Sequence, residues 1–222
     1  MKKLYTALFV VLCLCAFNTD LLAQWNIGLN FNYTRPLDQY DQNLEKDPKG
    51  FSINTLYSPF KGRHLMVGAE LGVSMYANDE YDIITSGGEE IQIDEEDCFL
   101  SYHALLRYQL APGQLFNPYV EGRLGGVSFF STRMAEEGAE EYFESETSFH
   151  GTAFNMSVGG GLALNVGSHL AIDLGVSLSR GAKTDYRSIE AGDASLRRSL
   201  DYGVHKSYTH CMNYRLGILL GF

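Results

Sequence analysis

The residues best suited to chemistry are six charged side chains that fall on otherwise weakly polar faces of alternating segments. They are Glu70, Arg107, Glu121, Arg123, Asp173 and Arg215. Each lies about four to seven residues from a short turn or from the C-terminus, so all six should share one layer of the fold. Such a set can form mutual ion pairs or conduct protons or ions. Because three acids face three bases, we expect an interior ion-pair network, with an ion path as the alternative.

A second candidate is the pair His205 and Ser207, in which the histidine could activate the serine for attack on an ester. No carboxylate is convincingly placed to orient His205, and Ser207 has the same inward alternation as the charged residues. The remaining histidines show no metal-ligand spacing; His103, also inward, is expected to join the charged network by a hydrogen bond. No nucleotide-binding glycine loop is present. We therefore expect no catalytic residue, no metal and no cofactor.

Strands must position these residues, because apolar side chains alternate with period two from about residue 25 onward. Eight segments are long enough to cross a bilayer, which takes about 9 to 11 residues. They are residues 25–35, 50–59, 64–77, 97–111, 117–132, 149–165, 169–180 and 207–222. An even number permits closure without an exposed edge. The expected fold is all-β, a closed eight-stranded antiparallel transmembrane β-barrel.

The connections between these strands alternate between short and long. The short turns are 60–63, 112–116 and 166–168, and they contain the glycine and proline residues that tight reversals need. The long loops are 36–49, 78–96, 133–148 and 181–206. This alternation is typical of a membrane barrel that has short turns at one end and long loops at the other. Both termini are expected at the end with the short turns.

The distribution of apolar residues distinguishes a membrane barrel from a soluble one. In the segment 169–180, one face carries Leu170, Ile172, Leu174, Val176 and Leu178, and the other carries His169, Ala171, Asp173, Gly175, Ser177 and Ser179. A soluble ligand-binding barrel would place its apolar face inside and spread charge outside. Here the side chains of the polar face are mostly small and uncharged, which suits a narrow lumen. The apolar face is therefore expected to contact lipid.

The N-terminus has the three regions of a secretory signal peptide. Lys2 and Lys3 precede an apolar run from 4 to 17, and the small residue Ala23 precedes Gln24. The run is shorter than the roughly 20 apolar residues of a transmembrane helix. We expect a cleavable signal peptide over 1–23 and a barrel domain over 24–222.

The C-terminal eight residues resemble the sorting signal that the bacterial barrel-assembly machinery recognises on its clients. The matching positions are Arg215, Gly217, Leu220 and Phe222. With this motif, the chain over about 25–222 resembles OmpA/OmpX-like and PorT-like outer membrane β-barrel proteins. The resemblance implies a place in the bacterial outer membrane, periplasmic termini, extracellular long loops, and contact with outer membrane lipid and with the assembly machinery. A PorT-like role would imply assistance to protein secretion. The spacing of His205 and Ser207 is also similar to that of outer membrane lipid A deacylases.

Charge limits the possible partners. Loss of Lys2, Lys3 and Asp20 with the signal peptide leaves 15 bases and 26 acids, which makes nucleic acid an improbable partner. Acids crowd two stretches, 79–97 and 136–146, that contain no lysine or arginine. These stretches could bind a cation or a cationic partner, or they could be solvated loops, which the lack of a calcium-loop pattern favours.

Two cysteines, Cys98 and Cys211, remain in the mature chain. Alternation places Cys98 outward and Cys211 inward on strands that are not adjacent, so we expect two free thiols.

Three functions from different classes follow from the sequence as a whole. The leading hypothesis is a non-enzymatic surface barrel whose loops contact a partner, ligand or envelope component; the alternatives are a narrow channel and a lipid A-modifying enzyme.

Overall fold

The structure is a computed structural model that describes residues 25–38, 40, 44, 46–60, 62–84, 90–136, 143–188 and 203–221. The predicted signal peptide over 1–23 and the C-terminal Phe222 lie outside the described residues, so these two predictions are not tested by the fold. Within the described ranges, no helix is long and apolar enough to cross a membrane.

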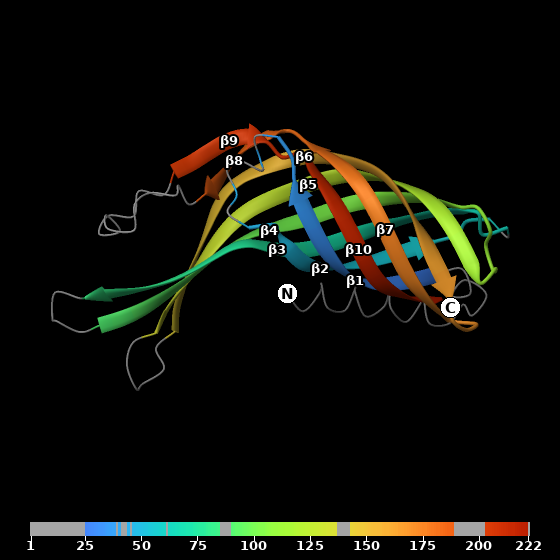
Figure 1. The fold of residues 1–222 in the computed structure, drawn as a ribbon, viewed down its shortest axis with the longest axis horizontal. Coiled ribbons are helices and arrows are strands. Elements are labelled where there is room, and N and C mark those ends of the chain that lie inside the picture. Colours follow the sequence, from blue (N-terminus) through green and yellow to red (C-terminus); the bar gives the residue numbers. More distant parts are fainter. Residues whose placement is uncertain are drawn as a thin grey trace, which may run out of the picture.

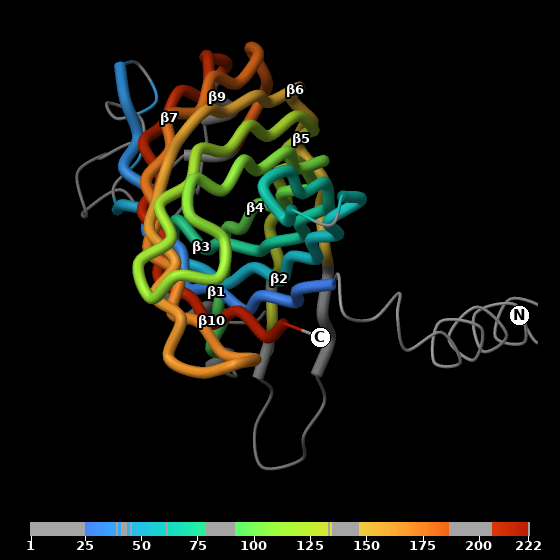
Figure 2. The backbone as a smooth tube through the Cα atoms, turned by 90° about the vertical axis from the view of Figure 1, so that its right-hand side faces the viewer, coloured from blue at the N-terminus to red at the C-terminus, as the bar shows by residue number. Residues whose placement is uncertain are grey.

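Eight strands close into an antiparallel barrel in the order β1-β10-β7-β6-β5-β4-β3-β2. They are β1 (Trp25–Pro36), β2 (Lys49–Tyr57), β3 (Leu65–Ile84), β4 (Glu90–Gln109), β5 (Phe116–Glu136), β6 (Phe143–Asn165), β7 (Leu170–Gly181) and β10 (Cys211–Gly221). Figure 1 shows the barrel from the side and Figure 2 shows it end-on. The first and last strands close it, with Asn26 opposite Gly221 and Pro36 opposite Cys211. The predicted closed eight-stranded antiparallel barrel is thus confirmed.

The two ends of the barrel differ. At one end β1 begins, β10 finishes, and short turns join β2 to β3, β4 to β5 and β6 to β7; we call it the terminus end. In the second of these turns Gly113 has a φ of 80°, a left-handed conformation that favours glycine. The opposite end is the long-strand end, because β3 to β6 continue beyond the other four strands there (Figure 1).

The lengths of β3 to β6 correct the predicted loops. These strands have 20, 20, 21 and 23 residues, whereas β1, β2, β7 and β10 have 12, 9, 12 and 11. Most of 78–96 and part of 133–148 are therefore paired strand rather than loop, with Ile84 opposite Glu90. The prediction was wrong because dense acidic residues suggested solvated loops. A strand that leaves the bilayer can carry charge without losing its backbone pairing.

The last predicted loop, 181–206, is also corrected. It contains a two-stranded hairpin, β8 (Lys183–Ser188) and β9 (Gly203–Tyr208), which forms its own sheet. The predicted strand 207–222 is divided at Thr209 and His210, and β10 begins at Cys211. The N–H of Leu37 donates to the C=O of His210, so this break is bonded to the chain that leaves β1.

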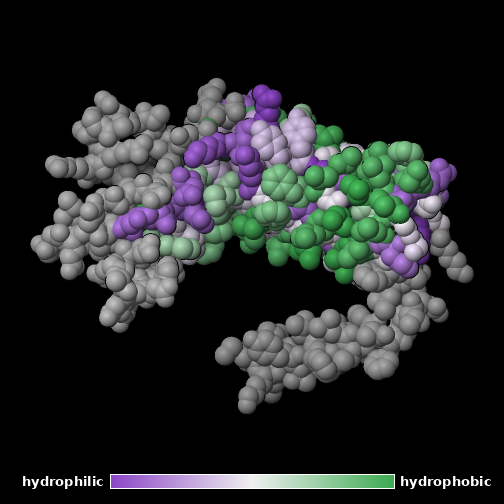
Figure 3. Space-filling model, turned by 60° about the horizontal axis from the view of Figure 1, so that its bottom comes forward, coloured by the Kyte–Doolittle hydropathy of each residue, from purple (hydrophilic) through white to green (hydrophobic). Residues whose placement is uncertain are grey.

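The faces of the barrel wall follow the predicted alternation. In β7 every second residue from Leu170 to Leu178 is exposed, while Ala171, Asp173, Ser177 and Ser179 are buried. Figure 3 shows the result on one side of the molecule as a broad apolar band with hydrophilic residues at its borders. An apolar exterior with a polar interior is the arrangement of a membrane barrel.

Candidate functional site

The six charged residues predicted from the sequence converge inside the barrel, where each side chain is at most 9% exposed. Glu121 of β5 lies at the centre of the group. Its Oε2 is 2.7 Å from Arg107 Nη2, and its Oε1 is 2.7 Å from Arg123 Nε and 3.2 Å from Arg215 Nη1. One carboxylate thus contacts all three guanidinium groups.

The other two carboxylates complete the group, which we call the lumen network. Asp173 Oδ2 lies 3.2 Å from Arg107 Nη2 and 3.3 Å from Arg215 Nε. Glu70 receives a hydrogen bond from Arg123 Nη1 at 2.9 Å and lies 3.5 Å from Arg215 Nη1. Glu70 and Arg107 are on neighbouring strands but form no ion pair, because in register Glu70 faces His103 and Arg107 faces Met66. Glu70 instead pairs with Arg123 and Arg215 on non-adjacent strands, whereas Arg107 pairs with Glu121, which is directly opposite it on β5, and with Asp173 on β7.

Tyr119 belongs to the lumen network, although no sequence pattern singled it out. The guanidinium of Arg107 lies over its ring at 4.0 Å, a cation–π contact. Its hydroxyl accepts a hydrogen bond from Arg215 Nη2 at 2.9 Å. A Cβ on Gly161 would lie 2.2 Å from that hydroxyl, so the glycine makes room for the ring. A usable signal was nevertheless present in the sequence, since Tyr119 shares the inward alternation of Glu121 on β5.

A small polar cavity of about 60 Å³ adjoins the lumen network on the side of the long-strand end. Its wall includes Glu70, Arg123 and His103, and His103 Nε2 is 3.2 Å from Asn155 Oδ1. A second space, of about 10 Å³, lies beside Tyr119 and Glu121. A water molecule occupies about 30 Å³ of liquid volume. These spaces therefore accommodate only a few waters.

Aromatic side chains cover the lumen at the long-strand end. This aromatic cap consists of Tyr40, Tyr76, Phe99, Phe129 and Tyr186. Phe129 is central, with ring centroids 5.8 Å from Phe99, 6.1 Å from Tyr76 and 5.6 Å from Tyr186. Burial raises the pKa of the Tyr40 hydroxyl well above its ordinary value, so that group stays neutral. Tyr40 comes from the β1–β2 connection and Tyr186 from β8, two segments without the strand alternation that identified the barrel.

Two apolar groups cover the lumen at the terminus end. They are Leu56, Met66 and Leu105 on β2 to β4, and Ala163, Ala171 and Leu219 on β6, β7 and β10. The lumen network therefore lies between apolar layers on both sides. Water has little access to its charges, which strengthens the mutual ion pairs and raises the cost of losing one partner.

The predicted C-terminal sorting motif lies on β10. Arg215 and Gly217 face the lumen, whereas Leu216, Ile218 and Leu220 are exposed on the wall. A Cβ on Gly217 would lie 2.1 Å from Asn30 Oδ1, so the glycine allows close contact with β1. Phe222 is outside the described residues. Recognition of these residues by the assembly machinery stays a prediction.

Two serines that could act as nucleophiles, Ser207 and Ser131, are buried and hydrogen-bonded. Ser207 is buried in β9, and its Oγ lies 2.8 Å from the hydroxyl of Tyr186 in the aromatic cap. Ser131 donates a hydrogen bond to Asp97, and its Oγ is also 2.6 Å from His150 Nε2. In a catalytic triad the histidine lies between the serine and the carboxylate, whereas here the serine lies between them. The sequence spacing of these three residues contained no signal for this contact.

Cys98 and Cys211 are both buried free thiols, which confirms that prediction. Within the described ranges, no group of three or more histidine, cysteine, aspartate or glutamate residues is arranged to hold a metal ion.

Comparisons with known proteins give the chain its family. Neisserial surface protein A is similar in structure, with 13% identity, 89% of this chain and 97% of that chain covered, and a TM-score of 0.47. Ail of Yersinia pestis is 17% identical, with 90% of this chain and 97% of that chain covered and a TM-score of 0.44. A major outer membrane protein of Thermus thermophilus is 12% identical, with 89% of this chain and 99% of that chain covered and a TM-score of 0.44. No curated protein sequence matches. The family model described as "Outer membrane protein beta-barrel domain" matches residues 4–198. The chain therefore belongs to the outer membrane protein beta-barrel domain family of the bacterial outer membrane.

Proposed function

We propose that this protein is a non-enzymatic barrel that conducts no ions and presents a projecting acidic sheet to a cationic partner. The observation that carries the proposal is the closed interior, in which the fully buried Arg107 and Asp173 belong to a network covered by apolar layers at both ends. An eight-stranded barrel has room only for side chains. A barrel closed in this way acts through its surface.

The closed interior predicts that the purified, folded barrel gives no stepwise conductance in a planar bilayer. Ions need a continuous hydrated path, and the spaces that the described residues leave beside the lumen network measure about 60 and 10 Å³. The measurement compares the wild type with Arg215→Ala, which removes one lumen cation. Reproducible conductance steps that change in Arg215→Ala would contradict the closed lumen and favour the alternative, a narrow channel.

The projecting sheet consists of segments 77–84, 90–97, 131–136 and 143–149 of β3 to β6. Its pairing continues to Ile84 opposite Glu90 and to Glu136 opposite Phe143. These segments are six to eight residues long, or about 20 to 26 Å at 3.3 Å per residue. Figure 1 shows β3 and β4 continuing away from the barrel at this end. A paired sheet of this length offers a larger and more ordered surface than separate loops.

The composition of the projecting sheet indicates the charge of the partner. Arg133 is the one base in these segments. The acids are Asp79, Glu80, Asp82, Glu90, Asp94, Glu96, Glu136, Glu144 and Glu146, in addition to Glu95 and Asp97, whose side chains are buried. A concentration of one sign accelerates association with the opposite sign and disfavours like-charged partners. A basic protein segment is the partner that fits this surface.

The proposed orientation places the terminus end in the periplasm and the projecting sheet outside the cell. This orientation is supported by the short turns at the terminus end, since membrane barrels have short periplasmic turns and longer extracellular connections. The C-terminal strand, with Arg215, Gly217 and Leu220, is the segment we propose the assembly machinery recognises from the periplasm. A PorT-like part in secretion has no specific observation in its favour.

A basic peptide tests the projecting sheet. The folded barrel in nanodiscs should bind a ten-residue lysine peptide in a salt-dependent manner, and the triple variant Glu90→Gln, Asp94→Asn, Glu144→Gln should bind it about tenfold more weakly. The matched control neutralises the same number of acids in the β1–β2 connection, with Asp38→Asn, Asp41→Asn and Glu45→Gln. An equal loss in both triple variants would show that net charge alone, and not the projecting sheet, attracts the peptide.

A further inference from the structure

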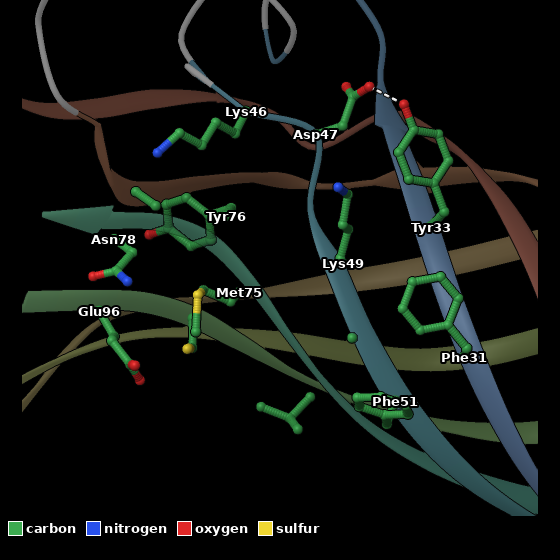
Figure 4. A pocket seen from close by; sticks show the side chains of 14 residues that line it. Phe31, Tyr33, Lys46, Asp47, Lys49, Phe51, Met75, Tyr76, Asn78 and Glu96 are labelled. Atoms are coloured by element: carbon green, nitrogen blue, oxygen red, sulfur yellow. Dashed lines mark hydrogen bonds between the residues drawn. The ribbon is translucent and has the colours of Figure 1, made fainter.

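A groove of about 790 Å³ lies on the outside of the barrel wall near the long-strand end, where β1 to β4 approach the β1–β2 connection. Figure 4 shows its side chains from close by. We call it the wall groove and define it by six lining residues: Phe31, Lys46, Lys49, Phe51, Val73 and Met75. Its volume lies within the range of about 300 to 1,000 Å³ that is typical of small-molecule sites.

The floor of the wall groove is apolar and belongs to the lipid-facing band. Phe31, Phe51, Val73 and Met75 are all exposed, and Phe51 is 61% exposed. Phe31 and Phe51 lie opposite each other on β1 and β2, with their ring centroids 5.6 Å apart. Gly50 lies between Lys49 and Phe51 and adds no side chain to the space. The floor therefore fits a hydrocarbon chain that lies along the wall.

The rim of the wall groove carries two free cations. Lys46 and Lys49 line the groove on the side of the β1–β2 connection (Figure 4), and among the described residues neither forms an ion pair. Asp47, between them, accepts a hydrogen bond from the Tyr33 hydroxyl, which Figure 4 marks. Lysine binds phosphate as a flexible point charge. The rim therefore fits an anionic headgroup directly above the apolar floor.

An acid on the other side of the wall groove limits where that headgroup can lie. Glu96 lines the groove beside Asn78 and away from the two lysines (Figure 4). A phosphate next to Glu96 would meet only a like charge, whereas a phosphate at the rim meets two opposite charges, Lys46 and Lys49, against the single carboxylate of Asp47, which already accepts a hydrogen bond from Tyr33. The groove is thus polarised, with its favourable anion position above Phe51.

We infer that the wall groove binds a phosphate-bearing glycolipid of the outer leaflet, with one acyl chain on the apolar floor and a phosphate at Lys46 and Lys49. The inference rests on the proposed orientation, because that orientation puts the long-strand end in the leaflet that bacterial outer membranes build from phosphorylated glycolipid. Each lysine near an anionic lipid surface contributes about fivefold to affinity. An ordered lipid here would link the barrel wall to the β1–β2 connection, which supplies Tyr40 to the aromatic cap.

Native mass spectrometry of the folded barrel in detergent micelles tests the inference directly, because it does not depend on orientation. The barrel is titrated with bisphosphorylated lipid A, with the same lipid after removal of its phosphates, and with phosphatidylglycerol. The double variant Lys46→Gln, Lys49→Gln should bind bisphosphorylated lipid A at least about tenfold more weakly. The matched double variant Lys183→Gln, Lys206→Gln changes two exposed lysines of the β8–β9 hairpin and should bind like the wild type.

A second pair of variants tests the floor. Val73→Trp should fill the groove and weaken lipid A binding, whereas Val120→Trp, on the exposed wall of β5 outside the groove, should not. A faster mobility of unheated than of boiled samples on SDS gels verifies that each variant is folded. Equal binding of dephosphorylated lipid A, or unchanged binding by the Lys46 and Lys49 variant, would overturn the inference. Equal binding of phosphatidylglycerol would overturn the assignment to a glycolipid.

The outcomes separate this inference from the proposed function. The conductance and lysine-peptide measurements use barrels without lipid A, so they stand if the wall groove binds nothing. A groove that binds lipid A in a barrel that conducts ions would leave the inference intact and overturn the closed lumen.

Discussion

Replacing Arg107 by alanine should lower the free energy of unfolding by about 3 to 5 kcal/mol, because it leaves three buried carboxylates with only two buried cations, Arg123 and Arg215. Arg107 and Asp173 are both 0% exposed, and Arg107 also contacts Glu121 at 2.7 Å and stacks on Tyr119. Urea unfolding in lipid vesicles, followed by the fluorescence of the single tryptophan Trp25 and by gel mobility, measures the change.

The control for Arg107→Ala is Arg180→Ala, which removes an exposed arginine from β7 and should change stability by no more than about 0.5 kcal/mol. The double variant Arg107→Ala, Asp173→Ala should lose less than the sum of its single variants, since each removal already breaks the shared contact. A loss below about 1 kcal/mol in Arg107→Ala would mean that the lumen network contributes no more than an exposed ion pair.

Replacing Phe129 by alanine should lower the free energy of unfolding by about 3 to 5 kcal/mol, because it opens a cavity in the centre of the aromatic cap. Phe129 is 1% exposed and contacts rings from β3, from β4, from β8 and from the β1–β2 connection. Its loss should therefore also loosen the β8–β9 hairpin. Faster proteolysis of the native barrel within that hairpin, together with urea unfolding, measures both effects.

Phe149→Ala is the matched control for Phe129→Ala. It removes the same side chain from β6, but Phe149 is 77% exposed, so stability should change by no more than about 0.5 kcal/mol. If Phe129→Ala resembled this control, the aromatic cap would not contribute to the closure of the lumen, and Tyr40 and Tyr186 would only rest on its surface.

The strands and their faces could be predicted because alternation is a local property of extended backbone. Each residue of a strand points opposite to its neighbour, so Leu170 to Leu178 could be assigned outward and Asp173 inward without knowledge of the other strands. The same reasoning selected all six charged members of the lumen network. Tyr119 obeys the same alternation, but its part in the network depends on contacts with Arg107 and Arg215 on other strands, which the pattern along β5 does not encode.

The ends of the strands could not be predicted as well. Charge density at 79–97 resembled a loop, yet the backbone pairing of β3 and β4 continues to Ile84 and Glu90. The β8–β9 hairpin was missed for a related reason, since its strands have six residues each and bury one face against the barrel. Short strands that depend on tertiary contacts carry little periodic signal of their own.

The sequence by itself determined the eight-stranded barrel, the lipid-facing side and the six charged residues that enter the lumen, because all of these follow from local alternation. Only the tertiary structure decided which partners meet. Glu121 contacts Arg107 of the neighbouring strand, Arg123 of its own strand and Arg215 from a non-adjacent strand. Glu70 pairs with Arg123 and not with Arg107, because a long side chain can reach past the adjacent strand in a narrow lumen. The aromatic cap and the wall groove likewise depend on the connection between β1 and β2. Its position is set by packing on distant strands, which no local pattern encodes.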